Sequence, residues 1–435
     1  MAVRMEWVHL SPSVRYASPM LRRFVPPRCP MAKTRVACLC GSLPVPAAVF
    51  VIASILVAIA TAFLPSQTNA ASPLPTHPDN PYATHRAYAS LYVFDVRTGT
   101  ELLSDNADEP RAPASLTKMM TLLLLMETVE SGKAAWSDSV TVPWQSEKVG
   151  GSGVGLQDNE VLLLEDAAKA LIVSSGNDAA IAIAEHLAHS ENVWVQRMNR
   201  RAKELGMRNT YYKTSHGLDG WRSQSVTTAH DQGLLVQELM RHPRILEWTS
   251  SRSMVIRGGQ TIVNTNKLLG VFPGMDGVKT GYTGPAKFCL ASTAKRDGFR
   301  VGCVLLGGWS SVDRFRETEW ALTEAFLRFR LELPVEAGAP IGAPIAILDG
   351  DPALVQPIAT EDLPIVRPRT NPTPLEVVIV PISGLRAPLA AGTEIARIEV
   401  LEGERLVTRS VAVIDTPVAR LSWWDKFKRR FQKKS

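Results

Sequence analysis

The sequence predicts a mixed α/β domain followed by a small β-rich module. Between residues 83 and 333, segments with the helical period of apolar residues are interspersed with segments that alternate apolar and polar residues. Helices inserted among antiparallel strands are typical of a mixed domain. Residues 335–420 instead contain short alternating runs rich in Pro, Val and Ile without a helical period, which predicts a β-sandwich-like module. The chain of 435 residues is long enough for both units.

The helices are predicted from apolar spacing and from start and stop signals. They cover residues 113–130, 162–173, 179–188, 193–205, 229–240 and 313–329. The strands are predicted from alternation between turn residues. They cover residues 88–101 as a hairpin, 140–143, 254–264 as a hairpin, 278–294 and 300–306, and then 344–348, 375–380, 394–401 and 406–414 in the module.

The distribution of charge argues against a nucleic-acid-binding body. The formal charge is +6, but residues 1–70 hold seven Lys and Arg against one acidic residue, and residues 421–435 hold six against one. The remaining residues, 71–420, hold 35 basic and 40 acidic residues, a net charge of −5. A mildly acidic body does not fit a DNA- or RNA-binding protein.

Residues 1–70 predict an N-terminal extension and a signal peptide. An apolar run over residues 47–64 follows the basic residues Lys33 and Arg35, and small residues before Ala71 suit cleavage. An uncleaved membrane anchor is the alternative, because the run just reaches spanning length. Both interpretations predict an exported protein.

Of the five cysteines, only Cys289 and Cys303 lie outside residues 1–70. They fall on two predicted neighbouring strands, so a disulfide between them is one interpretation. Two buried free thiols are the favoured interpretation, and two cysteines imply no disulfide framework.

The run from Pro113 to Thr121 opens the first predicted helix. In a helix, Ser115 and Lys118 are three residues apart, so both side chains stand on one face at the positive end of the helix dipole. A serine hydroxyl is a weak nucleophile until a base takes its proton. A lysine amine one turn away can act as that base if burial or a second cation lowers its pKa.

This Ser-x-x-Lys motif is weak on its own, since a chain of this length contains roughly one or two by chance. Ser292 and Lys295 form such a match, but in a predicted strand residues three apart point to opposite faces. The motif gains specificity only from partners elsewhere in the chain.

Two further segments supply those partners. Ser175-Gly-Asn177 lies in a break between predicted helices, where side chains can point into a cleft, although Ser190-Glu-Asn192 has the same spacing. Lys279-Thr-Gly281 opens a predicted strand, and the glycine would let a substrate backbone approach closely. In this order the three motifs are the signature of β-lactamases and penicillin-binding proteins.

Four segments, at residues 114–120, 175–179, 216–219 and 276–281, resemble the serine-type D-alanyl-D-alanine carboxypeptidases, the low-molecular-mass penicillin-binding proteins. The resemblance implies that residues 83–333 form a β-lactamase/transpeptidase-like domain, with an antiparallel sheet and a helical subdomain. The Ser-Gly-Asn form of the second motif favours the carboxypeptidase branch over the larger transpeptidases.

The resemblance also implies the catalytic roles. Ser115 would attack the carbonyl between two D-alanines of a peptidoglycan stem peptide and form an acyl-enzyme. Lys118, kept neutral partly by Lys279, would be the base, and Ser175 would relay a proton to the leaving D-alanine. β-Lactam antibiotics would acylate Ser115 and leave slowly. No cofactor or metal is implied.

The implied substrate-binding residues are Asn177, Lys279, Thr280, Gly281 and Tyr282. Lys279 and Thr280 would bind the terminal carboxylate of the substrate, and Asn177 the peptide chain and Lys118. Tyr282 replaces a histidine often found in the family. We expect little effect of this change, because its backbone N–H would complete the oxyanion hole with that of Ser115.

Residues 421–435 predict an amphipathic helix that lies on a membrane surface. Leu421, Trp424, Phe427 and Phe431 share one helical face, and Lys and Arg occupy the rest. A disordered basic tail is the alternative. With the signal peptide, this helix predicts a periplasmic enzyme, peripheral on the outer face of the cytoplasmic membrane.

The same motifs are also compatible with three other functions. A secreted β-lactamase would turn penicillin over rapidly and would not need the module or the tail. A D,D-endopeptidase would use the same residues on cross-linked peptides. A cell-wall scaffold with an inactive site would not react with penicillin at Ser115.

Overall fold

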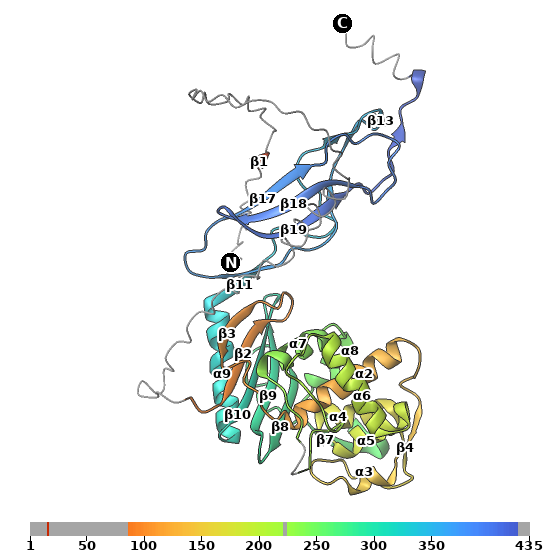
Figure 1. The fold of residues 1–435 in the computed structure, drawn as a ribbon, viewed down its shortest axis with the longest axis vertical. Coiled ribbons are helices and arrows are strands. Elements are labelled where there is room, and N and C mark those ends of the chain that lie inside the picture. The colour runs from red at the N-terminus through yellow and green to blue at the C-terminus, as the bar shows by residue number, and fades with distance from the viewer. Residues whose placement is uncertain (1–14, 17–85, 221–223, 425–435) are drawn as a thin grey trace, which may run out of the picture. The chain divides into compact units, whose positions relative to one another are not determined.

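A computed structural model describes residues 15–16, 86–220 and 224–424 (Figure 1). The predicted apolar run of the signal peptide and residues 425–435 of the predicted tail helix lie outside these residues. Among the helices of the described ranges, none combines the length and apolar character needed to cross a bilayer.

A five-stranded antiparallel sheet forms the centre of the mixed domain, with the strand order β3-β2-β10-β9-β8. Its strands are β2 (Ser90–Asp95), β3 (Glu101–Asp105), β8 (Met275–Thr283), β9 (Lys287–Arg296) and β10 (Phe299–Gly308). The first and last parts of the domain thus pair through β2 and β10. Strand β8 lies at an edge, where its outer side is free of sheet partners among the described residues.

The prediction of one strand over residues 278–294 was wrong. The segment is two antiparallel strands, β8 and β9, which pair with each other across a turn after Thr283. The turn contains Gly284 and Pro285, and proline fixes its φ and lacks the N–H that a central strand position would use.

The sheet separates two helical layers. Most helices cover one face, and α9 (Ser311–Arg328) covers the other (Figure 1). The helices of the first layer are α2 (Thr117–Glu130), α3 (Trp144–Lys148), α4 (Leu164–Val173), α5 (Asn177–Ala188), α6 (Glu191–Glu204), α7 (Ala229–Leu239) and α8 (Pro243–Thr249). Two short hairpins complete it, formed by β4 (Ser139–Thr141) with β5 (Val161–Leu163) and by β6 (Ser253–Ile256) with β7 (Gln260–Val263).

Strand β2 contributes side chains to the apolar cores on both faces of the sheet. Tyr92 and Phe94 belong to the apolar core shared with the first helical layer, whereas Leu91 and Val93 belong to the core beneath α9. Alternate residues of a strand point to opposite faces, so a strand buried on both faces is apolar throughout. All six residues of β2 are buried.

Helix α2 occupies the middle of the first layer. Nine of its 14 residues are buried, and it contacts α4, α5, α6 and α7. A helix that is apolar on all sides is a core helix. The Ser-x-x-Lys motif at its start is therefore held in the interior of the domain.

The module after α9 has its own apolar core, which includes Val335, Ile379 and Ile398. The strands of its main sheet have the order β17-β18-β19-β15. They are β15 (Ile358–Ala359), β17 (Leu375–Pro381), β18 (Glu394–Glu402) and β19 (Arg405–Val413). A two-residue strand, β1 (Arg15–Tyr16), precedes the mixed domain in the chain. Short pairs are formed by β11 (Phe329–Glu332) with β16 (Ile365–Pro368), β12 (Ile345–Ala346) with β14 (Leu354–Val355), and β13 (Gly350–Asp351) with β20 (Ala419–Arg420).

Cys289 and Cys303 are free, buried thiols on β9 and β10. The favoured interpretation, two free thiols without a disulfide between them, is confirmed.

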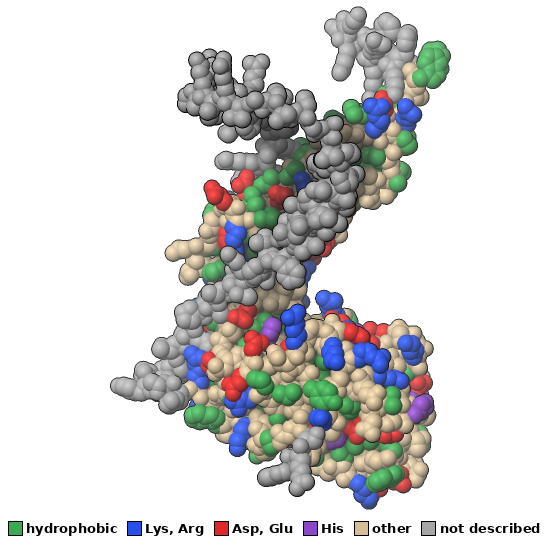
Figure 2. All heavy atoms as spheres, in the orientation of Figure 1, with side chains coloured by type: hydrophobic (Ala, Val, Ile, Leu, Met, Phe, Trp, Pro, Cys, Tyr) green, Lys and Arg blue, Asp and Glu red, His purple; other side chains and the backbone are tan. Residues whose placement is uncertain are grey.

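On the face drawn in Figure 2, Lys and Arg side chains are interspersed with Asp and Glu over the mixed domain. This mixture agrees with the near balance of charges in residues 71–420.

Candidate active site

Ser115 lies on a short 3-10 turn, Ala114–Leu116, that leads directly into α2. Ala114 has a φ of +49°, which is uncommon for a residue other than glycine. The regular helix predicted from Pro113 therefore begins only at Thr117. The Ser115 and Lys118 side chains nevertheless lie side by side, as predicted. Lys118 is in the first turn of α2, and its Nζ lies 2.9 Å from Ser115 Oγ.

Lys118 is completely buried and has three polar neighbours. Besides Ser115 Oγ, its Nζ lies 2.6 Å from Asn177 Oδ1 and 2.7 Å from the carbonyl oxygen of His216. Both oxygens can only accept hydrogen bonds. A neutral amine would donate its two N–H groups to them, and its lone pair would then face the hydroxyl of Ser115. This arrangement allows the amine to take the hydroxyl proton.

The electrostatics favour that neutral amine. Burial, followed by the charge of Lys279, holds the pKa of Lys118 well below its usual range, although Asp178 acts in the opposite direction. Burial and then Arg314 lower the pKa of Lys279 to about 7. Two buried lysines near each other disfavour the state in which both carry a charge.

The Ser-Gly-Asn segment lies at the junction of α4 and α5, as predicted. Ser175 is buried and has a φ of +67°, and Asn177 begins α5. The backbone N–H of Asn177 donates to the carbonyl of Ser152, and its side-chain Nδ2 donates to the carbonyl of Gly150. The glycine-rich loop at residues 150–155, which precedes α4, thus fixes the orientation of the Asn177 amide and directs Oδ1 to Lys118.

Asp178 holds this glycine-rich loop in place. Its Oδ2 accepts backbone N–H groups from Val154, Gly155 and Leu156 at 2.8, 3.0 and 3.2 Å. A carboxylate that receives several backbone donors is a strong anchor for a loop. Asp178 follows Asn177 directly in the sequence, but its role as an anchor was not predicted.

The Lys-Thr-Gly segment lies in the edge strand β8, against the turn that carries Ser115. A Cβ on Gly281 would lie 3.2 Å from the backbone nitrogen of Ser115 and 3.2 Å from Ala114 Cβ, so only glycine fits without displacement. Lys279 is buried and donates to the carbonyl of Thr280 at 2.8 Å. Tyr282 is 56% exposed, at the rim of the site.

Arg314 lies behind β8 and was not predicted. From the first turn of α9 its guanidinium donates to the carbonyls of Gly281 and Cys289, at 3.1 and 3.3 Å, and lies over the rings of Phe288 and Phe315. Burial lowers the pKa of Arg314 to about 10. The only signal in the sequence was an arginine on the apolar face of a helix.

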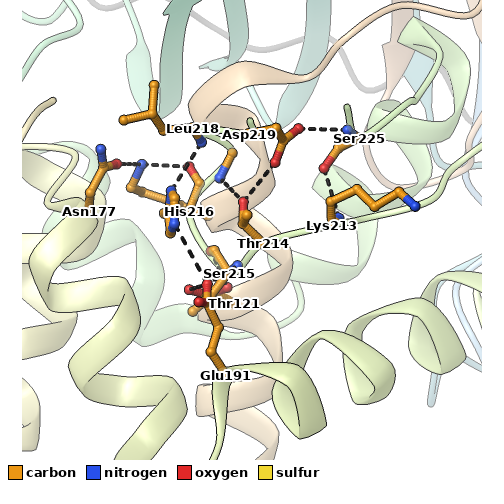
Figure 3. Close-up of polar contacts among 12 residues, drawn as sticks. Thr121, Asn177, Glu191, Lys213, Thr214, Ser215, His216, Leu218, Asp219 and Ser225 are labelled. Carbon is orange, nitrogen blue, oxygen red and sulfur yellow. Dashed lines mark hydrogen bonds and ion pairs between the residues drawn. The ribbon is translucent and has the colours of Figure 1, made fainter. Parts of the chain in front are cut away.

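His216 contributes through its backbone. The ring is buried, and burial and then Lys118 lower the pKa of His216 to about 3, so the ring is neutral. Its Nδ1 accepts the backbone N–H of Leu218, and its Nε2 lies 3.6 Å from Glu191 Oε1 (Figure 3). The same Glu191 oxygen accepts both donors of Ser215. These contacts hold the His216 carbonyl beside Lys118.

The chance match in β9 lies apart from these residues. Ser292 is buried and donates to the carbonyl of Cys303 on the next strand, whereas Lys295 is exposed. Their side chains point to opposite faces of the strand, as the spacing predicted.

Comparison with known proteins gives a consistent result. The family model described as D-alanyl-D-alanine carboxypeptidase matches residues 76–310. The chain is 36% identical to D-alanyl-D-alanine carboxypeptidase DacF of Bacillus subtilis over 249 residues, which cover 56% of this chain and 63% of the relative. It is 28% identical to D-alanyl-D-alanine carboxypeptidase DacD of Salmonella typhimurium over 352 residues, 79% of this chain and 89% of the relative. The match thus spans less than two thirds of the Bacillus relative and most of the Salmonella one.

Solved structures show the same similarity. Penicillin binding protein 5 from Haemophilus influenzae matches with a TM-score of 0.67 and 26% identity, covering 77% of this chain and 98% of that protein. Penicillin-binding protein D2 from Listeria monocytogenes in the ampicillin-bound form matches with a TM-score of 0.52 and 31% identity, covering 56% and 98%.

Proposed function

The chain belongs to the D-alanyl-D-alanine carboxypeptidase family, and we propose that it removes the terminal D-alanine from peptidoglycan stem peptides through an acyl-enzyme on Ser115. The family was predicted from the motifs and is confirmed by the match over residues 76–310. The chain is therefore a serine-type peptidase with a penicillin-binding fold. The roles of individual residues are our proposal.

In the acylation step, Ser115 Oγ attacks the carbonyl carbon between the two D-alanines while its proton passes to the neutral amine of Lys118. The peptide C–N bond then breaks, and the leaving amine receives a proton by way of Ser175. In the second step a water molecule hydrolyses the ester and frees Ser115. The peptide shortened by one D-alanine leaves the site.

The substrate is oriented at its carboxylate end. Lys279 and Thr280 bind the terminal carboxylate, and this anion would raise the pKa of Lys279 and keep it charged. Asn177 donates to the peptide chain, and Gly281 lets the substrate backbone approach. The backbone N–H groups of Ser115 and Tyr282 stabilise the oxyanion.

One observation carries this proposal: both N–H groups of a neutral Lys118 have oxygen acceptors, at 2.6 and 2.7 Å, and the third neighbour is the hydroxyl of Ser115. No water or cation needs to be invoked to orient the amine. The arrangement fits a proton acceptor for Ser115 better than a purely structural lysine, which would have a carboxylate partner.

The test is intact-mass spectrometry of the chain after incubation with penicillin. We expect one covalent adduct on the wild-type chain and none on Ser115→Ala. Ser292→Ala, at the chance match in β9, is the matched control and should retain the adduct. An adduct on Ser115→Ala would contradict the proposed nucleophile, and rapid loss of the wild-type adduct would indicate a β-lactamase.

We also propose the domain organisation that the sequence predicts: an extension and signal peptide over residues 1–70, a catalytic domain over 83–333, a β-rich domain over 335–420 and a tail over 421–435. Separate apolar cores support the division of the folded part. Helix α9 ends at Arg328, and the core of the β-rich domain begins with Val335.

We propose further that the exported enzyme is held on the anionic outer face of the cytoplasmic membrane by residues 421–435. Trp423 and Trp424 are 64% and 58% exposed, and their rings stack at 3.9 Å. Exposed Trp followed by Lys and Arg is typical of an interfacial segment. The full chain should sediment with vesicles containing phosphatidylglycerol. A chain without residues 421–435 should stay in the supernatant but still react with penicillin, and equal sedimentation of the two would refute the proposal.

A further inference from the structure

The glycine-rich loop at residues 150–155, which contacts Asn177, needs partners to hold its shape. Four of its six residues are glycines, and glycine loses more conformational freedom on folding than any other residue. The loop belongs to no helix or strand, so its backbone polar groups have no regular ladder to bind. Its order must therefore come from the side chains of neighbouring segments.

The turn between β6 and β7 supplies such side chains. Arg257 in this turn donates from Nη2 to the carbonyls of Val154 and Gly155, at 2.9 and 3.2 Å. Gln260 Nε2 donates to the same Val154 carbonyl at 3.1 Å. Asp178 thus binds the N–H groups of this part of the loop, and the turn binds its carbonyl groups.

Arg257 is itself fixed in one orientation. Its Nη1 forms an ion pair with Glu160, and both side chains are only 22% exposed. Its Nε donates to Gln260 Oε1 at 3.2 Å, and its backbone N–H donates to Asp166 Oδ2, in the first turn of α4, at 3.0 Å. The guanidinium is a planar fork with donors in fixed directions, so these contacts together define its position.

The loop transmits this position to Asn177. A Cβ on Gly151 would lie 2.7 Å from Asn177 Nδ2, so the loop packs directly against the amide. The same Nδ2 donates to the carbonyl of Gly150 at 2.9 Å. On the other side of the amide, Oδ1 lies 2.6 Å from Lys118 Nζ. A shift of the loop would therefore turn the amide and take an acceptor away from the amine.

We propose that Arg257 is a positioning residue for the acylation of Ser115. It holds the glycine-rich loop against Asn177, and the Asn177 amide in turn keeps Lys118 oriented towards the nucleophile. The inference rests on the proposed function, in which Lys118 is the base. The side-chain hydrogen bonds of Arg257 go to the loop and to neighbours of the turn, so it acts on the reaction only through the loop.

The test measures the rate of penicillin acylation of Arg257→Met by intact-mass spectrometry over time. Met keeps an apolar stem but donates no hydrogen bond. We expect acylation to be about tenfold slower, less than the roughly 10²-fold effect of a 1 Å displacement, because Gln260 and Asp178 still hold the loop. Arg257→Lys can keep the ion pair with Glu160 and one carbonyl contact, so its rate should lie about threefold below the wild type.

Arg252→Met is the matched control. Arg252 directly precedes β6 in the same hairpin, is exposed, and makes no side-chain hydrogen bond or ion pair with any residue that the structure describes. The substitution removes the same charge and should leave the acylation rate unchanged. Thermal unfolding of both variants shows whether either one destabilises the domain as a whole.

A double-mutant cycle distinguishes positioning through Asn177 from a general structural role. Asn177→Ala removes the amide through which the loop acts, and it slows acylation by itself. Adding Arg257→Met to this variant should then change the rate by less than about twofold. Independent effects would instead multiply, giving a further tenfold loss. If Arg257→Met lowers the unfolding temperature, Arg257→Lys in both backgrounds gives the same comparison, with about threefold and no further loss expected.

Two outcomes would overturn this inference: an Arg257→Met rate within twofold of the wild type, or the full tenfold loss in the Asn177→Ala background. Either outcome leaves the proposed function intact, because the wild-type chain would still form its adduct on Ser115. Failure of the proposed function would be visible separately, as the absence of an adduct on the wild-type chain.

Discussion

Replacing Lys118 with Met is expected to slow acylation of Ser115 by penicillin by about 10²-fold to 10⁴-fold, the usual contribution of a positioned base. Met fills a similar volume, so the buried site stays packed, but it cannot take the hydroxyl proton. Lys118 is completely buried, and its Nζ lies 2.9 Å from Ser115 Oγ. The rate is measured as the appearance of the adduct by intact-mass spectrometry over time.

Lys133→Met is the matched control, since Lys133 is exposed just beyond the end of α2 and should be dispensable. A second check uses pH. The amine acts only when neutral, so the wild-type rate should fall as the pH falls through the lowered pKa of Lys118. A Lys118→Met rate within tenfold of the wild type would show that another group removes the proton.

Helical spacing was sufficient to predict the contact between Ser115 and Lys118. Residues three apart at the start of a helix share a face whatever the rest of the fold does, so this part of the site is local. The 3-10 turn at Ala114–Leu116 altered the exact start of the helix without separating the two side chains. The break before Asn177 could be predicted for the same local reason.

The hydrogen bonds that hold the site's backbone segments in place could not be predicted in this way, because they join segments that are distant in the sequence. Arg314 reaches Gly281 across 33 positions of the chain, and Asp178 reaches Val154 across 24. No periodicity links such pairs. The resemblance to a family indicated which residues we propose to react, since motifs are defined by chemistry. It gave no information on which buried charge holds which backbone segment.

The error at residues 278–294 has a different origin. Both β8 and β9 are buried for most of their length, and β8 mixes apolar residues with the polar residues Asp276, Lys279 and Thr280. No regular alternation of apolar and polar residues therefore marks where one strand ends and the next begins. The turn residues Gly284 and Pro285 were the only available signal. A boundary placed at these two residues gives the two strands that the structure contains.

Gly217→Ala is expected to slow penicillin acylation by at least about 10²-fold, the effect of a displacement of roughly 1 Å in a reacting group. A Cβ on Gly217 would lie 1.9 Å from the carbonyl oxygen of Ala114 and 2.6 Å from its carbonyl carbon. These are backbone atoms of the residue before Ser115, so the clash can be relieved only by moving the nucleophile or the His216 segment. Gly217 also has a φ of +82°, which costs alanine roughly a further 1 kcal/mol.

Gly220→Ala, three residues along the same segment, is the matched control. Among the residues that the structure describes, a Cβ there meets no heavy atom within 4 Å, and its backbone is not in the left-handed region. This variant should therefore react with penicillin at the wild-type rate. Thermal unfolding of both variants separates a local displacement from general unfolding, because a folded Gly217→Ala protein with slow acylation isolates the effect on Ser115. Wild-type acylation by Gly217→Ala would mean that the His216 segment can move away from Ala114 without disturbing Lys118, and the rigid contact between the two segments would then play no part in positioning the nucleophile.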